Sequence, residues 1–109
     1  ALPIVRKNGD RRGEVSALQG LGVAMDDVGC TAEGFEYLRV GLPLLNALGD
    51  RRREALFLLT MGMYARKLGR QPAAQDLLSQ AKTLAHAIGA TDIEELAAAH
   101  LKRSGGGEA

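Results

Sequence analysis

The sequence of 109 residues has little cysteine, few aromatic residues and no excess of one charge. Its single cysteine, Cys30, excludes an internal disulfide framework and any CxxC metal or redox motif. Lys plus Arg number 14 and Asp plus Glu number 13, a balance that argues against a dedicated nucleic-acid binder or a polybasic membrane-surface protein. No apolar run approaches the roughly 20 residues of a membrane-spanning helix, and the first residues lack the layout of a signal peptide. These absences predict a cytoplasmic protein that contacts neither nucleic acid directly nor a membrane.

Groups of residues that could carry catalysis are missing as well. His86 and His100 lie 14 positions apart, and neither has a cysteine or carboxylate at the spacing of a metal site. Asp26 and Asp27 are neighbours, so on a helix their carboxylates point about 100° apart and do not form a glycosidase pair. Neither a GxGxxG motif after a strand nor a GxxxxGK[ST] phosphate loop occurs in the sequence. We expect no enzymatic activity, no cofactor and no metal site.

What the sequence does have is an ordered pattern of glycine. Gly9, Gly29, Gly49, Gly69 and Gly89 follow one another at a spacing of 20, and between them apolar residues recur three and four positions apart. That period is typical of amphipathic helices, and glycine readily takes the left-handed conformation that follows a helix end. Valine, isoleucine and threonine are sparse and do not alternate, so strands have no support. The pattern predicts an all-α chain with helices over 11–28, 31–48, 51–68, 71–88 and 91–103.

Polar residues mark the expected helix starts. Asp10, Thr31 and Asp50 are predicted N-caps, and the stretch from Thr91 to Glu94 is predicted to form a capping box. Pro43 lies inside the second predicted helix, where the lost backbone hydrogen bond costs about 3 kcal/mol and should kink the helix.

The predicted helices pair into a repeat of 40 residues. The stretch 9–12, Gly-Asp-Arg-Arg, recurs at 49–52, and Glu14 recurs as Glu54 and Glu94. Repeats of this length are typical of helical hairpins that stack on their neighbours in a solenoid. Leu-Pro at 2–3 matches Leu-Pro at 42–43, so residues 1–8 are interpreted as the tail of a preceding helix in a longer array. The predicted domain spans 1–103, with repeats over 9–48 and 49–88, a capping helix over 89–103, and a flexible tail over 104–109.

The repeated phrase resembles the tetratricopeptide repeat, in the longer variant with a period near 40 that occurs in polarity scaffolds and bacterial regulators. Its second copy runs leucine-glycine-aspartate-arginine over 48–51, followed by Met61-Gly62 and Tyr64-Ala65. The resemblance covers 1–103 and implies about two and a half repeats of antiparallel helix pairs in an α-solenoid. HEAT-like repeats share the period, but the leucine-glycine-aspartate-arginine phrase favours the tetratricopeptide family.

The resemblance also assigns small residues to the contacts between helices. At these positions a missing or short side chain would let two helices approach closely. The positions are Gly22, Gly34 and Gly41 in the first repeat and Gly62, Ala74 and Ala81 in the second.

In the family that the chain resembles, the first helix of each repeat lines an inner groove. Carried over position by position, this implies a partner-binding groove lined by Ser16, Gln19, Val23, Asp26, Asp27, Leu56, Leu59, Met63, Arg66 and Lys67. Three of these, Leu56, Leu59 and Met63, form an apolar stripe on a different side of the helix from the core stripe. Two explanations fit the stripe: it binds a partner, or it packs against the capping helix or a missing repeat.

The sequence thus predicts a protein–protein interaction module that binds a peptide or helix of a partner protein in its concave groove. One alternative is a sensory or oligomerisation segment of a multidomain bacterial transcriptional regulator. The chain has 10 Arg against 4 Lys and abundant Ala, Gly and Leu, a composition that suggests a GC-rich bacterial genome. Another is a structural repeat fragment that associates with itself as a homo-oligomer, because truncated repeats leave apolar end faces that can stack.

Overall fold

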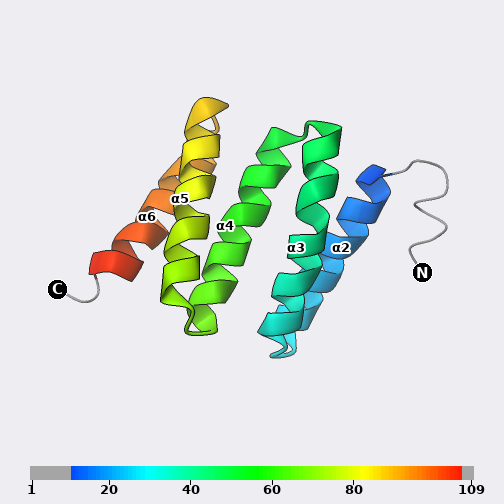
Figure 1. The fold of residues 1–109 in the computed structure, drawn as a ribbon, viewed down its shortest axis with the longest axis horizontal. Coiled ribbons are helices and arrows are strands. Elements are labelled where there is room, and N and C mark those ends of the chain that lie inside the picture. Colours follow the sequence, from blue (N-terminus) through cyan, green and yellow to red (C-terminus); the bar gives the residue numbers. More distant parts are fainter. Residues whose placement is uncertain (1–10, 107–109) are drawn as a thin grey trace.

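The computed structural model describes residues 11–106, with side chains up to residue 103, and this part of the chain is all helical. Its elements, in chain order, are α2 (Arg11–Asp27), α3 (Thr31–Leu48), α4 (Arg51–Lys67), α5 (Gln71–Ala87) and α6 (Thr91–Gly106) (Figure 1). The predicted all-α class is confirmed for these residues, and the ends of the first four helices agree with the expected ones to within one residue.

The last helix departs from the expectation at its C-terminal end. It continues to Gly106, so residues 104–106 of the predicted flexible tail are helical. The remainder of that tail, 107–109, and the predicted helix tail over 1–8 lie outside the described residues.

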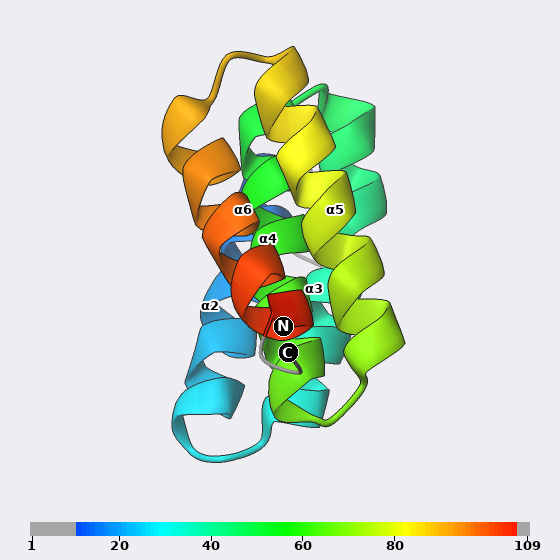
Figure 2. The same ribbon diagram turned by 90° about the vertical axis from the view of Figure 1, so that its left-hand side faces the viewer.

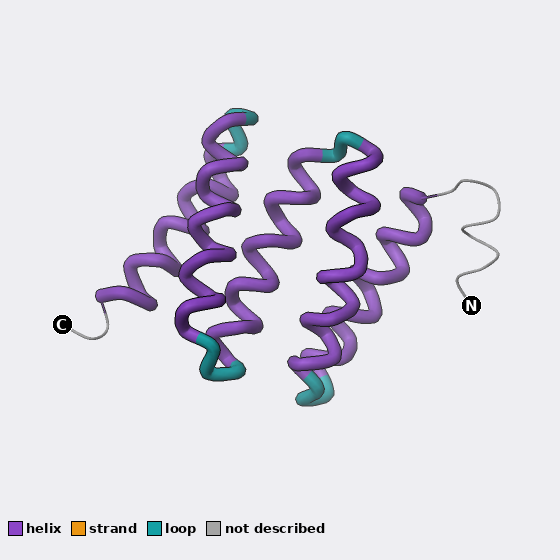
Figure 3. The backbone as a smooth tube through the Cα atoms, viewed as in Figure 1, coloured by secondary structure: helices purple, strands orange, loops and turns teal. Residues whose placement is uncertain are grey.

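Consecutive helices run antiparallel and form two layers. Viewed along the longest axis of the structure, α2, α4 and α6 make up one layer and α3 and α5 the other (Figure 2). The links between helices lie alternately at the two ends of the layers (Figure 3). Most packing joins helices that follow each other in the chain, and α4 also packs on α6. As a result α4 occupies the centre of the described structure.

Each link between helices contains a glycine in the left-handed conformation. Gly29, Gly49, Gly69 and Gly89 have φ of 89°, 71°, 78° and 73°. The amide after each glycine donates to a carbonyl five residues back, as from Cys30 N to the Met25 oxygen at 2.7 Å. This is the Schellman geometry, which satisfies carbonyl groups at the helix end. The glycine spacing of 20 residues therefore predicted the four turns correctly.

Among the predicted capping residues, one is confirmed, two are wrong, and Asp10 lies outside the described residues. The Asp50 side chain accepts a hydrogen bond from the Arg53 amide at 3.1 Å, as an N-cap does. Thr31 and Thr91 are instead the first residues inside their helices. The residue directly after the turn glycine occupies the capping position, and both threonines come one residue later. Pro43 does not interrupt α3, which continues to Leu48.

Helices of one hairpin touch through glycine. A Cβ atom added at Gly34 would lie 2.5 Å from the Gly22 carbonyl oxygen, and one added at Gly62 would lie 2.7 Å from Leu78 Cγ. A Cβ at Gly41 would lie 2.7 Å from the Phe57 ring, in the contact between α3 and α4. All six small residues predicted at helix contacts are buried, as expected.

Two clusters of buried residues lie on either side of α4. The first core contains Val15, Leu38, Leu45, Phe57, Met61 and Tyr64. The second core contains Ala55, Leu58, Leu59, Leu78, Ala81, Ala85, Ala90, Ile93 and Ala97. Because α4 supplies residues to both, its position fixes the two hairpins relative to each other.

Candidate functional site

The predicted groove residues lie on α2 and α4, in the same layer as α6 (Figure 2). We call the outward side of this layer the α2–α4–α6 face. Ser16, Val23, Asp27 and Lys67 are exposed there, and Gln19, Asp26, Leu56, Met63 and Arg66 are half-buried. The tenth residue, Leu59, differs from the others because only 5% of it is exposed.

Leu59 belongs to the second core and is not available to a partner. It lies in one cluster with Ile93 and Ala97 of α6, and Leu56 and Met63 pack against the same cluster. The predicted apolar stripe thus packs in a cluster to which the last helix contributes, which agrees with one of its two explanations. A helix apolar on two sides is here buried on two sides.

Polar contacts join α2 to α4 at both ends of this face. Lys67 Nζ donates to the two carboxylate oxygens of Asp26 at 2.9 and 3.0 Å, and Arg53 donates to Ser16 Oγ at 3.4 Å. Asp26 also accepts from the Thr31 hydroxyl at 2.7 Å. The hydrogen bonds from Lys67 and Thr31 lower the pKa of Asp26, because they favour its charged form. The structure therefore brings Asp26 and Lys67 together as a pair, although they lie 41 positions apart in the sequence.

A second set of polar contacts joins α4 to α6. Arg52 binds both carboxylate oxygens of Asp92, at 2.6 and 3.3 Å, and lowers the pKa of that carboxyl group. Arg66 Nη2 lies 3.1 Å from His100 Nδ1. Because arginine can only donate, this bond needs a neutral imidazole that accepts at Nδ1. Burial, followed by the charges of Arg66 and Arg103, lowers the pKa of His100 and keeps the ring neutral.

Apolar side chains occupy the middle of the face, between these polar contacts. On α6, Leu96 lies four residues from Asp92 and four from His100, so it shares their side of the helix. It is 51% exposed, and Val23 on α2 is 42% exposed. Between them α4 presents the half-buried Leu56 and Met63. We call Val23, Leu56, Met63 and Leu96 the central strip, and the polar contacts at its two ends the polar frame.

Sequence reasoning missed the contribution of α6 to this face. The groove prediction stopped at the second repeat, although the offset of 40 residues carries Leu56 directly onto Leu96. It also missed Arg52 and Arg53, which reach the neighbouring helices. The repeat could have indicated Leu96, whereas the arginine contacts depend on how the helices are placed.

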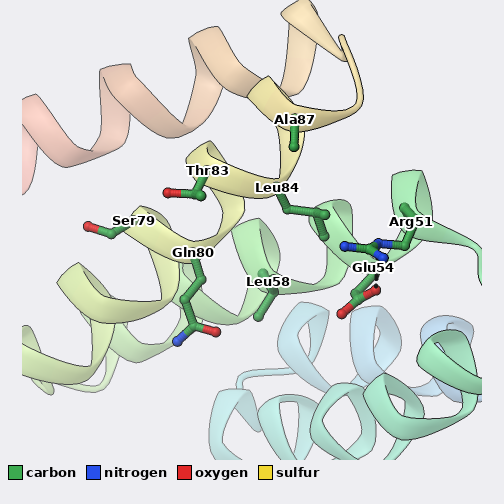
Figure 4. A pocket seen from close by; sticks show the side chains of 8 residues that line it. All are labelled: Arg51, Glu54, Leu58, Ser79, Gln80, Thr83, Leu84 and Ala87. Carbon is green, nitrogen blue, oxygen red and sulfur yellow. Dashed lines mark ion pairs between the residues drawn. The ribbon is translucent and has the colours of Figure 1, made fainter.

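A cavity of about 440 Å³ lies elsewhere, between α4 and α5 (Figure 4). Leu58 and Leu84 form its apolar side, and Ser79, Gln80 and Thr83 contribute polar groups. Arg51 and Glu54 form an ion pair in it, with 3.7 Å between Nε and Oε1 (Figure 4). None of the predicted groove residues lines this cavity.

The described residues contain no group of three or more His, Cys, Asp or Glu side chains placed to hold a metal ion. Within the same part of the chain, no helix combines the length and apolar character needed to cross a membrane. A comparison with protein-family models and with curated proteins finds no match to the chain.

Proposed function

We propose that the chain is a tetratricopeptide-like α-solenoid of about two and a half repeats. Four Schellman turns at a spacing of 20 residues support this architecture, together with the 40-residue sequence repeat. The two layers of alternating helices and the glycine contacts within each hairpin are consistent with it.

We further propose that the protein is an interaction module that binds a peptide or helix of a partner protein on the α2–α4–α6 face. The observation that carries this proposal is the exposure of Val23 and Leu96 on either side of the half-buried Leu56 and Met63. Partly exposed apolar side chains that are rimmed by polar groups are typical of interaction surfaces. An apolar anchor of the partner would lie on the central strip, and the polar frame would form the rim.

The polar frame sets the chemistry of the rim. Arg52 is already paired with Asp92 and Lys67 with Asp26, so a partner need not neutralise these charges to bind. Lys67 and Arg52 remain more than half exposed, and they can also accept a carboxylate of the partner. This favours a partner segment with one or two large apolar residues and acidic residues near its ends.

A phage-displayed library of random 16-residue peptides, selected on the full chain, tests this function. We expect peptides with apolar anchors to be enriched, and their affinity to fall at least about tenfold in Val23→Asp and Leu96→Asp, because a buried carboxylate would face the anchor. Ile88→Asp is the matched control, since Ile88 is also exposed but lies at the end of α5. Selected peptides that bind the strip variants as tightly as the control would contradict the proposed face.

A further inference from the structure

The cavity between α4 and α5 is not explained by the proposed partner-binding face, because none of its lining residues belongs to that face. Its volume of about 440 Å³ lies in the range of about 300–1,000 Å³ that is typical of small-molecule sites. The side chains of Arg51 and Leu84 extend toward each other from the two helices, and Glu54 lies beside Arg51 (Figure 4). The cavity thus combines a charged end at the start of α4 with an apolar wall.

The first repeat contains a smaller copy of this cavity, of about 310 Å³. Its lining residues are Arg11, Glu14, Val40 and Leu44, which correspond at the offset of 40 to Arg51, Glu54, Gln80 and Leu84. Only the third of these pairs changes character, from Val40 to Gln80. Ser79 and Thr83, which also line the larger cavity, stand where the first repeat has arginine and proline. The uncharged polar groups are therefore specific to the second cavity, because the first repeat is built without them.

Glu54 supplies an acceptor that no group in the described structure satisfies. Its Oε1 atom is buried and accepts no hydrogen bond, and among the described residues it is the one buried side-chain oxygen or nitrogen of this kind. Arg51 Nε lies 3.7 Å from this oxygen, which is close enough for an ion pair but too far for a hydrogen bond. Since buried polar groups are normally paired, a carboxylate oxygen in this position favours a ligand that donates to it, above all an ammonium group.

Gln80 and Arg51 add a second acceptor and a donor. Gln80 Nε2 donates to Asp76 at 2.9 Å, which leaves the carbonyl oxygen of the same amide to accept. Arg51 can only donate, and its side chain is 58% exposed. Because no hydrogen bond holds it to Glu54, its guanidinium can turn toward a ligand carboxylate.

We infer that this cavity binds a free α-amino acid with a branched aliphatic side chain. The ammonium group donates to Oε1 of Glu54 and Oε1 of Gln80, and the carboxylate pairs with Arg51. As Arg51 turns onto the carboxylate, the buried Glu54 oxygen becomes accessible to the ammonium. The aliphatic side chain packs against Leu58 and Leu84. Arg51 and Glu54 are neutral as a pair, so a ligand with one charge of each sign matches them better than a cation or an anion alone.

A titration of the full chain with L-leucine, followed by heteronuclear NMR of the backbone amides, tests the inference. We expect saturable shifts at millimolar ligand in the first two turns of α4 and over residues 79–87 of α5. Two analogues separate the charges, since isocaproate lacks the ammonium and isopentylamine lacks the carboxylate. Each analogue should bind at least about tenfold more weakly than leucine, because one charged contact is lost.

Substitutions assign the roles of the lining residues. Glu54→Gln and Arg51→Gln should each weaken leucine binding at least about tenfold. Arg51→Gln should not weaken the binding of isopentylamine, because that ligand has no carboxylate. Gln80→Val, which introduces the residue of the first repeat at an exposed position, should weaken leucine binding severalfold without affecting folding.

Arg39→Gln is the matched control for the loss of an arginine. Arg39 is 59% exposed, forms an ion pair with Glu36 three residues before it, and does not line the cavity. Its substitution should leave the affinity for leucine unchanged. The amide spectrum of each variant without ligand shows whether it is folded.

Four results would overturn the inference. Leucine could shift no amide of the cavity, or isopentylamine could bind as tightly as leucine, which would indicate a site for cations in general. Folded Glu54→Gln and Gln80→Val could both bind leucine as the natural chain does. Shifts confined to α2 and α6 would place the amino acid on the proposed partner-binding face instead.

Discussion

Replacement of Gly34 by alanine tests the contact where α2 and α3 touch through bare backbone. The new Cβ atom would lie 2.5 Å from the Gly22 carbonyl oxygen, whereas ordinary contact begins at 3.4 Å. The two helices must therefore separate by about 0.9 Å at this point. A flexible side chain could rotate away, but a backbone oxygen inside a helix cannot.

The size of the effect follows from two opposing contributions. Overpacking of a tight interior contact costs about 1–3 kcal/mol, and a rigid neighbour places Gly34→Ala near the upper value. Alanine is better than glycine inside a helix by about 1 kcal/mol, which offsets part of that cost. We expect the free energy of unfolding to fall by about 2 kcal/mol, or the urea midpoint by about 1 M.

Gly20→Ala is the matched control for this experiment. Gly20 lies inside α2, and a Cβ atom there would meet nothing within 4 Å. The same chemical change should therefore stabilise the protein, by about 0.5–1 kcal/mol. Urea unfolding followed by circular dichroism at 222 nm measures both variants. If Gly34→Ala were as stable as Gly20→Ala, the close approach of α2 and α3 would be wrong.

Two further predictions concern α6 and its contacts. Leu59→Ala should lower the free energy of unfolding by about 2–5 kcal/mol, since it leaves a cavity in the second core. Leu96→Ala should change the free energy of unfolding by less than about 0.5 kcal/mol, because that side chain is half exposed. Equal losses for the two variants in urea unfolding would contradict the placement of Leu59. The pKa of His100 is lowered in the folded state, so the unfolded chain binds more protons and stability should fall as the pH drops below about 6.5, the unfolded value. His100→Gln should remove this part of the loss between pH 7.5 and 5.5, and an unchanged pH dependence in the variant would show that the ring is not held neutral.

The helices and their turns were predictable because both depend on local sequence. A glycine every 20 residues and an apolar period between three and four determine where helices end and which side is buried. The errors at Thr31 and Thr91 are local too. Threonine is a good capping residue, but the geometry of the turn assigns the cap to the residue directly after the glycine, and that residue is Cys30 in one case.

The candidate site was less predictable because it depends on which helix covers which side of α4. Periodicity shows that Leu56, Leu59 and Met63 share a side, but it cannot show that α6 lies against it. The burial of Leu59 and the exposure of Leu96 follow from that packing alone. The pair formed by Asp26 and Lys67 likewise needs the placement of two helices that are far apart in sequence.

The predominance of contacts between consecutive helices has a consequence for how the protein folds and opens. Low contact order means that little chain must be ordered before contacts form, so folding on the microsecond to millisecond scale is expected. In the described structure α2 packs mainly on α3, so its amides should exchange with solvent before those of the central α4.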